Sequence, residues 1–364
     1  MLEAGTIRRV RQTLIANNLA EGSLVAWRIP EGKLDAAFEF MFREDPFSGH
    51  VVIRSTDANP RFFSKLASDD EVPGVSGAQP RSVYKILDEA SNGTTRQFAS
   101  EVEFRKKSIP GSAFKLWTTI KVPAGFSLQE HCALLQKKTG AESFRLMQAK
   151  GIFTLGVGHV RRKASQPGDR ADQPATMMMP SVVKLTDHEW NILLELKREF
   201  LPEEIVSFPW RQRAQKAGVS EEEFYEVARS LQERKLLGRF STFLEHVKPS
   251  AAGVRVTRFN GLFHWAVPPG REAEAGAEIG RHDILTHCYW REGGPEFYHV
   301  NIMGVAHGTD RARLFEHKAA IDRHLEEAGI PLLYTNVFWG GRSEIKPSEI
   351  SPLIYQEWWK KMNF

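Results

Sequence analysis

Residues 265–308, WAVPPGREAEAGAEIGRHDILTHCYWREGGPEFYHVNIMGVAHG, are the stretch that decides the fold. They predict a strand, a helix over 271–280 and a hairpin. ILTHCYWR and FYHVNIMGVAHG are rich in β-branched and aromatic residues, and Glu292-Gly293-Gly294-Pro295 between them is typical of a turn. A helix over 309–328 and a strand in LLYTNVFWG follow. The predicted order is therefore strand, helix, strand, strand, helix, strand.

A weaker copy of this stretch lies near the N-terminus. Trp27-Arg-Ile-Pro-Glu-Gly matches Trp265-Ala-Val-Pro-Pro-Gly, His50 and His287 follow after 23 and 22 positions, and Arg54 and Arg291 lie four residues beyond each histidine. Phe114-Lys-Leu-Trp then takes the place of Val300-Asn-Ile-Met, with Lys121 opposite His307. The repeat predicts two homologous sheets about a pseudo-two-fold axis, as in a dimer built into one chain.

Both copies have the element order of the ferredoxin-like split βαβ plan, so an α+β fold is expected. Residues 6–15 and 23–29 read as strands with a turn at Asn17-Asn18, a helix spans 33–43, and 50–55, 114–122 and 152–160 read as further strands. We predict a first ferredoxin-like domain over 1–163 with an insertion at 56–112, which carries short helices around 61–67 and 82–89.

In the middle of the chain the apolar residues have helical spacing. A Pro- and Gly-rich linker over 164–182, whose three methionines at 177–179 are expected to dock on a neighbour, leads into three helices over 183–238. Thr186 with Glu189 and Ser220 with Glu223 are capping boxes, as is Ser127 with Glu130 in the first half. The spacing predicts a helix-turn-helix domain followed by a wing-like strand.

The second ferredoxin-like domain is predicted over 239–345, and its sheet is expected to begin at Arg239, with FSTFLEHV pairing with VRVTRFN. A tail over 346–364 carries Tyr355, Trp358 and Trp359 and should pack as a helix.

Composition limits the class of protein. The 364 residues are 41% hydrophobic and 26% charged, with a net charge of +4, which suits a globular protein that binds an anionic small molecule better than one that binds nucleic acid. No run of eighteen apolar residues exists, the N-terminus has no apolar signal region, and the two cysteines, Cys132 and Cys288, lie in unrelated contexts. We expect a cytoplasmic protein with free thiols and no membrane partner.

Leu185–Gly238 followed by a ferredoxin-like domain resembles the Lrp/AsnC architecture. Within it, His287-Cys-Tyr-Trp-Arg, Asn301 and His307-Gly308 resemble the sirohaem decarboxylases of alternative haem and haem d1 synthesis, which work as pairs of related subunits, sometimes fused. The first half resembles the partner subunit in Pro46-x-x-x-His50-x-x-x-Arg54, Phe114-Lys-Leu-Trp117-Thr-Thr and Thr139-Gly-Ala-Glu. It departs from the second half in three ways: it has no helix-turn-helix, it has Val52 in place of Tyr289, and it carries the insertion.

The resemblance implies removal of carbon dioxide from two acetate arms of sirohaem, which gives 12,18-didecarboxysirohaem. This chemistry needs a proton donor near neutral pH, and imidazole has a suitable pKa. The candidate acids are His287, His307 and His50. The candidate substrate-binding residues are Arg54 and Arg291 as carboxylate anchors, with Tyr289, Asn301, Lys115 and Trp117, and with Met303 covering the ring. No metal site and no cofactor beyond the iron tetrapyrrole substrate is implied, and a homodimer or a related subunit is a possible partner.

Other interpretations stay open. A histidine on a strand can be purely structural, and the arginines can be surface charges. The helix-turn-helix suggests a DNA-binding regulator, but its expected recognition helix, SEEEFYEVARSLQERK, has five glutamates against three basic residues, so phosphates would repel it. Trp210-Arg-Gln-Arg is the only nearby basic cluster. A tetrapyrrole-binding protein without catalytic activity is the third possibility.

Overall fold

Eight antiparallel strands close into one barrel in the computed structural model, which describes residues 7–56, 109–155, 165–244 and 258–363. Around the barrel the order is β10-β3-β4-β2-β5-β8-β9-β7. The strands are β2 (Ala20–Arg28), β3 (Ser48–Thr56), β4 (Phe114–Pro123), β5 (Ser143–Leu155), β7 (Phe259–Ala266), β8 (Leu285–Arg291), β9 (Ile302–Gly308) and β10 (Tyr334–Ile345). The sequence predicted two homologous sheets, one in each half, but their strands join in a single barrel: β10 pairs with β3 and β5 with β8, and this closure leaves the barrel without free strand edges.

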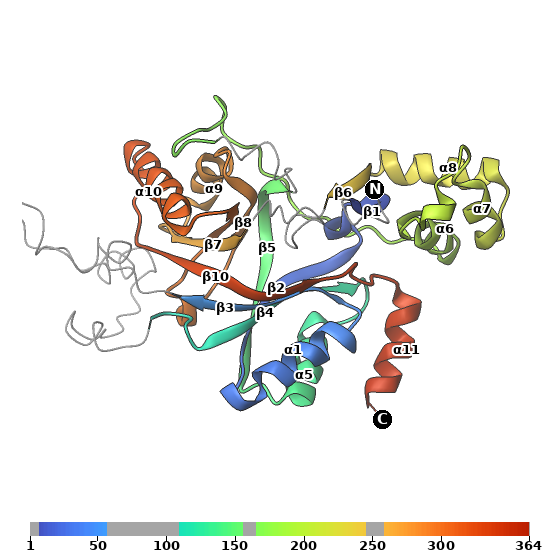
Figure 1. The fold of residues 1–364 in the computed structure, drawn as a ribbon, viewed down its shortest axis with the longest axis horizontal. Coiled ribbons are helices and arrows are strands. Elements are labelled where there is room, and N and C mark those ends of the chain that lie inside the picture. The colour runs from blue at the N-terminus through green and yellow to red at the C-terminus, as the bar shows by residue number, and fades with distance from the viewer. Residues whose placement is uncertain (1–6, 57–108, 156–164, 245–257, 364) are drawn as a thin grey trace, which may run out of the picture.

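Helices cover two opposite sides of the barrel (Figure 1). On β2–β5 lie α1 (Leu34–Arg43), α5 (Leu128–Thr139) and the tail helix α11 (Pro352–Asn363), which buries Tyr355 and Trp358 as predicted. On β7–β10 lie α9 (Glu272–Gly280) and α10 (Arg311–Glu327). Ser127 caps α5 by accepting a hydrogen bond from the Glu130 N–H, which is one of the two bonds of the predicted capping box.

The first strand, β1 (Ile7–Leu14), does not join the barrel. It pairs with β6 (Leu237–Leu244) in a separate two-stranded sheet, with Val10 opposite Thr242, and it does not form a hairpin with β2. The expectation that the second sheet begins at Arg239 was wrong for the same reason, since β6 is used by β1 and the barrel strands resume at Phe259. The Thr13 hydroxyl, which donates to the Arg239 carbonyl, reinforces this long-range pairing. Of the stretch VRVTRFN (254–260), which was expected to pair with FSTFLEHV, residues 254–257 lie outside the described residues, and Phe259 and Asn260 belong to β7, which pairs with β9.

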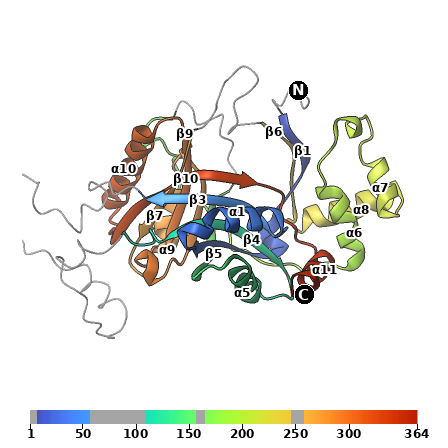
Figure 2. The same cartoon turned by 60° about the horizontal axis from the view of Figure 1, so that its bottom comes forward.

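The three central helices form a separate bundle: α6 (Asp187–Lys197), α7 (Arg211–Ala217) and α8 (Glu221–Glu233). Thr186 and Glu189 form the predicted capping box at α6, whereas at α8 Ser220 makes one of its two bonds by accepting from the Glu223 N–H. Trp190, Leu193, Phe224 and Leu231 belong to their shared apolar core. Both views of the ribbon show the β1–β6 sheet between this bundle and the barrel (Figures 1 and 2).

The predicted linker is partly attached to the barrel. Met178 exchanges two backbone hydrogen bonds with Ile152, and Met177 packs against the core under α9 and α10, whereas the Met179 side chain is exposed. The predicted helices around 61–67 and 82–89 lie outside the described residues. None of the helices in the described ranges is long and apolar enough to cross a membrane.

The barrel interior is divided along its length. Phe114, Phe297, Val300, Tyr334 and Phe338 fill one end with a buried apolar cluster. At the other end lie the beginnings of β2, β3, β7 and β8 and the last residues of β4 and β9. We call it the polar end, because basic side chains and imidazoles lie there among the apolar ones. This end positions the site described next.

Candidate functional site

A cavity of about 450 Å³ occupies the polar end of the barrel. Residues of seven barrel strands line it, and β1, Ala16 in the turn after β1, α6 and the segment after β10 contribute the rest. Because side chains alternate along a strand, His50, Val52 and Arg54 of β3 share this inner face, as do His287, Tyr289 and Arg291 of β8. The predicted residues that line this barrel cavity are His50, Arg54, Trp117, His287, Tyr289, Arg291, Met303 and His307.

The two arginines occupy equivalent places in the two halves. Trp27 pairs with Phe144 on β5, and Trp265 pairs with Thr335 on β10. Three residues further along each partner strand are Met147 and Phe338, and their carbonyls are the ones that accept hydrogen bonds from Arg291 and Arg54, respectively. The two arginines, which are equivalent in the sequence repeat, thus donate to carbonyls at equivalent positions of β5 and β10.

The cavity is strongly basic. Its lining holds six lysines and arginines and three histidines, and none of the described lining residues is an aspartate or a glutamate. Arg54 is 5% exposed and Arg291 9% exposed, and within the described part of the chain neither forms an ion pair with a carboxylate. Burial lowers the pKa of Arg54 to about 10 and also lowers the pKa of Arg291. Buried cations that lack a counter-charge are costly, which indicates an anionic ligand.

Each arginine is held by neutral groups. Arg54 Nη1 donates to Asn260 Oδ1 and to the Phe338 carbonyl, both at 3.3 Å, and its Nε has no hydrogen-bond partner among the described residues. The Arg291 guanidinium carbon lies 4.4 Å from the centre of the Tyr289 ring. Neutral and aromatic contacts of this kind orient a guanidinium and leave its charge available to a carboxylate.

The three candidate acids lie on different strands. His50 Nε2 is 2.8 Å from the Ser343 hydroxyl on β10, and His287 Nδ1 is 3.0 Å from the Thr286 hydroxyl. His287 and Tyr289 lie with nearly parallel rings whose centres are 6.1 Å apart. His307 lines the same cavity from β9. The arrangement surrounds one space with imidazoles from both halves.

Two predicted residues lie away from the cavity lining. The Asn301 side chain forms two hydrogen bonds with the Val267 backbone. Its Oδ1 accepts from Val267 N and its Nδ2 donates to Val267 O, each at 2.9 Å. Lys115 is half-buried, and its Nζ lies 3.5 Å from Glu31 Oε2. The register of β4 against β2 shifts between Leu116 and Phe114, so the alternation that points Trp117 inward does not extend to Lys115.

Several lining residues were missed by the sequence prediction. Arg11 and Lys197 come from β1 and α6, and Asn260 and Lys346 lie at the ends of β7 and β10. Lys121 had one signal, its position opposite His307 in the repeat. The others approach the cavity only through the β1–β6 pairing and the barrel closure, which no local pattern indicates.

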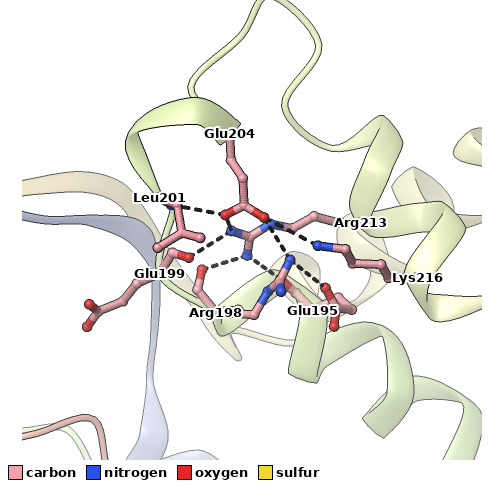
Figure 3. Close-up of polar contacts among 7 residues, drawn as sticks. All are labelled: Glu195, Arg198, Glu199, Leu201, Glu204, Arg213 and Lys216. Carbon is pink, nitrogen blue, oxygen red and sulfur yellow. Dashed lines mark hydrogen bonds and ion pairs between the residues drawn. The ribbon is translucent and has the colours of Figure 1, made fainter.

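The basic cluster of the helical bundle is used internally. Arg213 is almost completely buried and donates to Glu204 at 2.9 Å and to the carbonyls of Glu195, Arg198 and Glu199 (Figure 3). Arg211 pairs with Glu221 at 3.1 Å. These arginines therefore stabilise the bundle, and the contacts argue against a phosphate-binding role for this cluster.

No group of three or more His, Cys, Asp or Glu side chains within the described ranges is arranged to hold a metal ion. Both cysteines are free and buried.

Residues 257–338 match the family model of the AsnC-like ligand binding domain. A siroheme decarboxylase of Hydrogenobacter thermophilus is 24% identical over 202 residues, which are 55% of this chain and 56% of that protein. A siroheme decarboxylase NirH subunit of Paracoccus pantotrophus is 32% identical over 62 residues, 17% of this chain and 38% of that protein. The chain thus matches less than two thirds of the length of each of these relatives.

The fold is similar to that of a solved protein. The crystal structure of the siroheme decarboxylase NirDL aligns with a TM-score of 0.60 and 17% identity, over 100% of this chain and 85% of that one. A second structure of NirDL, in co-complex with an iron-uroporphyrin III analogue, aligns equally well. At this identity the similarity concerns the fold alone.

Proposed function

We propose that this chain is a sirohaem decarboxylase, which removes carbon dioxide from acetate arms of sirohaem. The observation that carries the proposal is the barrel cavity, in which Arg54 and Arg291 are buried without a carboxylate partner among the described residues. A macrocycle bearing many carboxylates supplies the counter-charges that this space lacks. The siroheme decarboxylases among the relatives act on such a macrocycle according to their names, which supports the choice of ligand.

The reaction needs a binding surface and a proton donor. Trp117 and Met303 form an apolar floor on which the flat ring can lie. Arg54 and Arg291 hold carboxylates that are retained, each through a charge-assisted hydrogen bond. As the carbon–carbon bond of an acetate arm breaks and carbon dioxide leaves, the electron pair stays on the ring-side carbon. A proton from His287, His307 or His50 then completes the methyl group.

The same observations support a fused pseudo-dimer as the finer architecture. The proposal pairs β2–β5 with β7–β10 as two ferredoxin-like halves and places the helical bundle between them in the sequence. The equivalent hydrogen bonds of Arg54 and Arg291 favour this arrangement. Further pairing with a second copy or a related subunit is a prediction that needs measurement of the oligomeric state.

Anaerobic incubation with sirohaem tests the activity. We expect the product to lack two molecules of carbon dioxide by mass. The His287→Ala variant should lower turnover by about 100-fold or more, with little loss of sirohaem binding, because a general acid contributes at least that factor. The exposed His188 in the helical bundle is the matched control, and His188→Ala should leave turnover unchanged.

The outcomes separate the alternatives. Sirohaem binding without loss of carbon dioxide would leave a tetrapyrrole-binding protein and exclude the decarboxylase. Unchanged turnover in His287→Ala would remove His287 as the acid and leave His307 and His50. Specific DNA binding in a gel shift at physiological salt would instead favour a regulator, against the acidic start of α8.

A further inference from the structure

A second chamber of about 590 Å³ adjoins the barrel cavity. It extends between the start of β2, the middle of β5 and the linker residues Pro180 and Val182. Six residues line both spaces: Leu14, Ala16, Thr119, Lys121, Tyr289 and Arg291. The polar members of this set come from β4 and β8, so the boundary between the chambers is built from both halves of the barrel.

Two cations stand together at this boundary. Lys121 is partly buried and donates to the side-chain oxygen of Asn17. Arg291 is 9% exposed and donates to the Met147 carbonyl. Within the described chain neither cation pairs with a carboxylate, and the Arg291 charge lies close enough to contribute to the lowered pKa of Lys121. Two adjacent cations whose only described hydrogen-bond acceptors are neutral form an anion site by charge and by geometry.

We propose that Lys121 and Arg291 form a carboxylate-binding subsite through which one acidic arm of the tetrapyrrole enters the second chamber. The inference rests on the proposed function for the class of ligand. Lys121 occupies the position equivalent to His307 in the repeat. Lys121 lies near Arg291, whereas His307 is paired with Asn260, which accepts a hydrogen bond from Arg54. The half-site around Arg291 therefore has a lysine where the half-site around Arg54 has an imidazole. The two half-sites therefore differ in chemistry, and this subsite anchors the ring in one orientation.

The subsite makes binding dependent on proton uptake. Burial and the Arg291 charge lower the pKa of Lys121 to about 8. A bound carboxylate would raise this pKa again, so Lys121 should take up a proton when the ligand binds at higher pH. Of the other groups around it, Arg291 stays charged, Tyr289 stays protonated because burial raises its pKa, and Glu21 and Lys150 line the second chamber beside it.

Calorimetry with iron-uroporphyrin III as the probe tests the proposal. Titrations at about pH 8.5, in buffers that differ in ionisation enthalpy, should show uptake of most of one proton by the wild-type protein. The Lys121→Arg variant should bind with similar affinity but without this uptake, because guanidinium is already protonated. The Lys121→Met variant should bind about 10-fold more weakly, also without uptake, as expected for the loss of one charge-assisted contact. The exposed Lys137 on α5 provides the control, and Lys137→Met should behave as wild type.

Two failures can be told apart. Wild-type affinity and undiminished proton uptake in both Lys121 variants would overturn the subsite while leaving the proposed function intact. If the wild-type protein does not bind iron-uroporphyrin III, the proposed function fails and the subsite fails with it. If the Lys121→Met variant does not fold, the Lys121→Arg variant still tests the proposal. Arginine retains the size and charge of lysine, and this variant must still lose the proton uptake on ligand binding.

Discussion

His264 shows how a single residue is fixed by its surroundings beneath the candidate site. It is 1% exposed on β7, its ring lies 4.8 Å from the Phe338 ring and 6.0 Å from the Trp117 ring, and neither nitrogen has a hydrogen-bond partner among the described residues. Burial, with smaller contributions from Arg54 and Lys318, lowers its pKa to about 3. The ring is therefore neutral at physiological pH, and its apolar surroundings select that form.

The pH dependence of stability follows from this pKa. In the unfolded chain His264 titrates near pH 6.5, so keeping it neutral in the fold adds no pH-dependent cost above that pH. Between about pH 6.5 and 3 the unfolded chain takes up a proton that the folded protein does not, and the free energy of unfolding falls progressively. We predict that His264→Phe removes this loss. We compare the unfolding free energy of the variant with that of wild type at each pH. This difference should be about 2 kcal/mol more favourable to the variant at pH 5 than at pH 7.5. Urea unfolding at both pH values measures this, and an equal difference at the two would contradict the pKa. His188→Gln, at an exposed position, serves as the control.

At this scale the sequence predicted which side chains come together better than it predicted the surroundings of each side chain. The repeat identified His50, Arg54, His287 and Arg291, and all four line the barrel cavity. It failed for Asn301 and Lys115, because a hydrogen bond to the Val267 backbone and a shift of strand register decide where those side chains lie. Contacts of this kind depend on neighbours far away in the sequence.

Among the elements, α11 is held in place by a buried polar network. Asp45, at the end of α1, accepts hydrogen bonds from Ser48 at 2.6 Å and from Phe47 N at 3.0 Å, and lies 3.4 Å from His131 on α5. His131 in turn stacks on Trp358 of α11, with ring centres 4.8 Å apart. Burial alone would raise the pKa of Asp45, but His131 and the hydrogen bonds outweigh it and lower the pKa. The network joins two helices to the start of β3, which carries His50.

Removing the Asp45 charge should therefore weaken the fold. We predict that Asp45→Asn costs about 3 kcal/mol of unfolding free energy at neutral pH, because it leaves the buried partners poorly compensated. A lowered carboxyl pKa contributes stability above the unfolded value near 3.9, and this contribution is lost as the pH falls through the folded value. The difference from wild type should hence narrow below about pH 4, as chemical unfolding at two pH values would reveal. Asp35→Asn, on the exposed face of α1, should change stability by about 0.5 kcal/mol or less.

Element types and caps were predictable because they depend on neighbours in the sequence. Ser127, Thr186 and Ser220 all cap the expected helices. Strand pairing was less predictable. β1 matched its expected residues but pairs with β6, more than 220 residues away, through contacts such as Val10 with Thr242. Local periodicity indicates that a segment is extended, but it does not specify its partner.

For the whole molecule, closure of the barrel decides how the two halves depend on each other. The sequence repeat led to the expectation of two sheets, but the joining pairs β3–β10 and β5–β8 are contacts between strands from different halves. The barrel cavity is likewise lined from both sides, with Arg54 and Trp117 from one half and His287 and Met303 from the other. A symmetric pattern predicts two equivalent units, but it does not show that they share one interior.

This shared interior predicts the behaviour of a cut chain. A protease site inserted at the turn of Gly168 and Asp169, in the predicted linker, would separate the two halves covalently while leaving every barrel strand intact. We expect the two fragments to stay associated in size-exclusion chromatography and to unfold in one transition. Each fragment alone would expose two unpaired strand edges and the apolar face of Trp117 or Met303, which is unfavourable in water. Iron-uroporphyrin III should still bind the cut protein if one cavity is built from both halves. Fragments that separate without denaturant, or that each bind the probe alone, would show instead that the halves are independent sites.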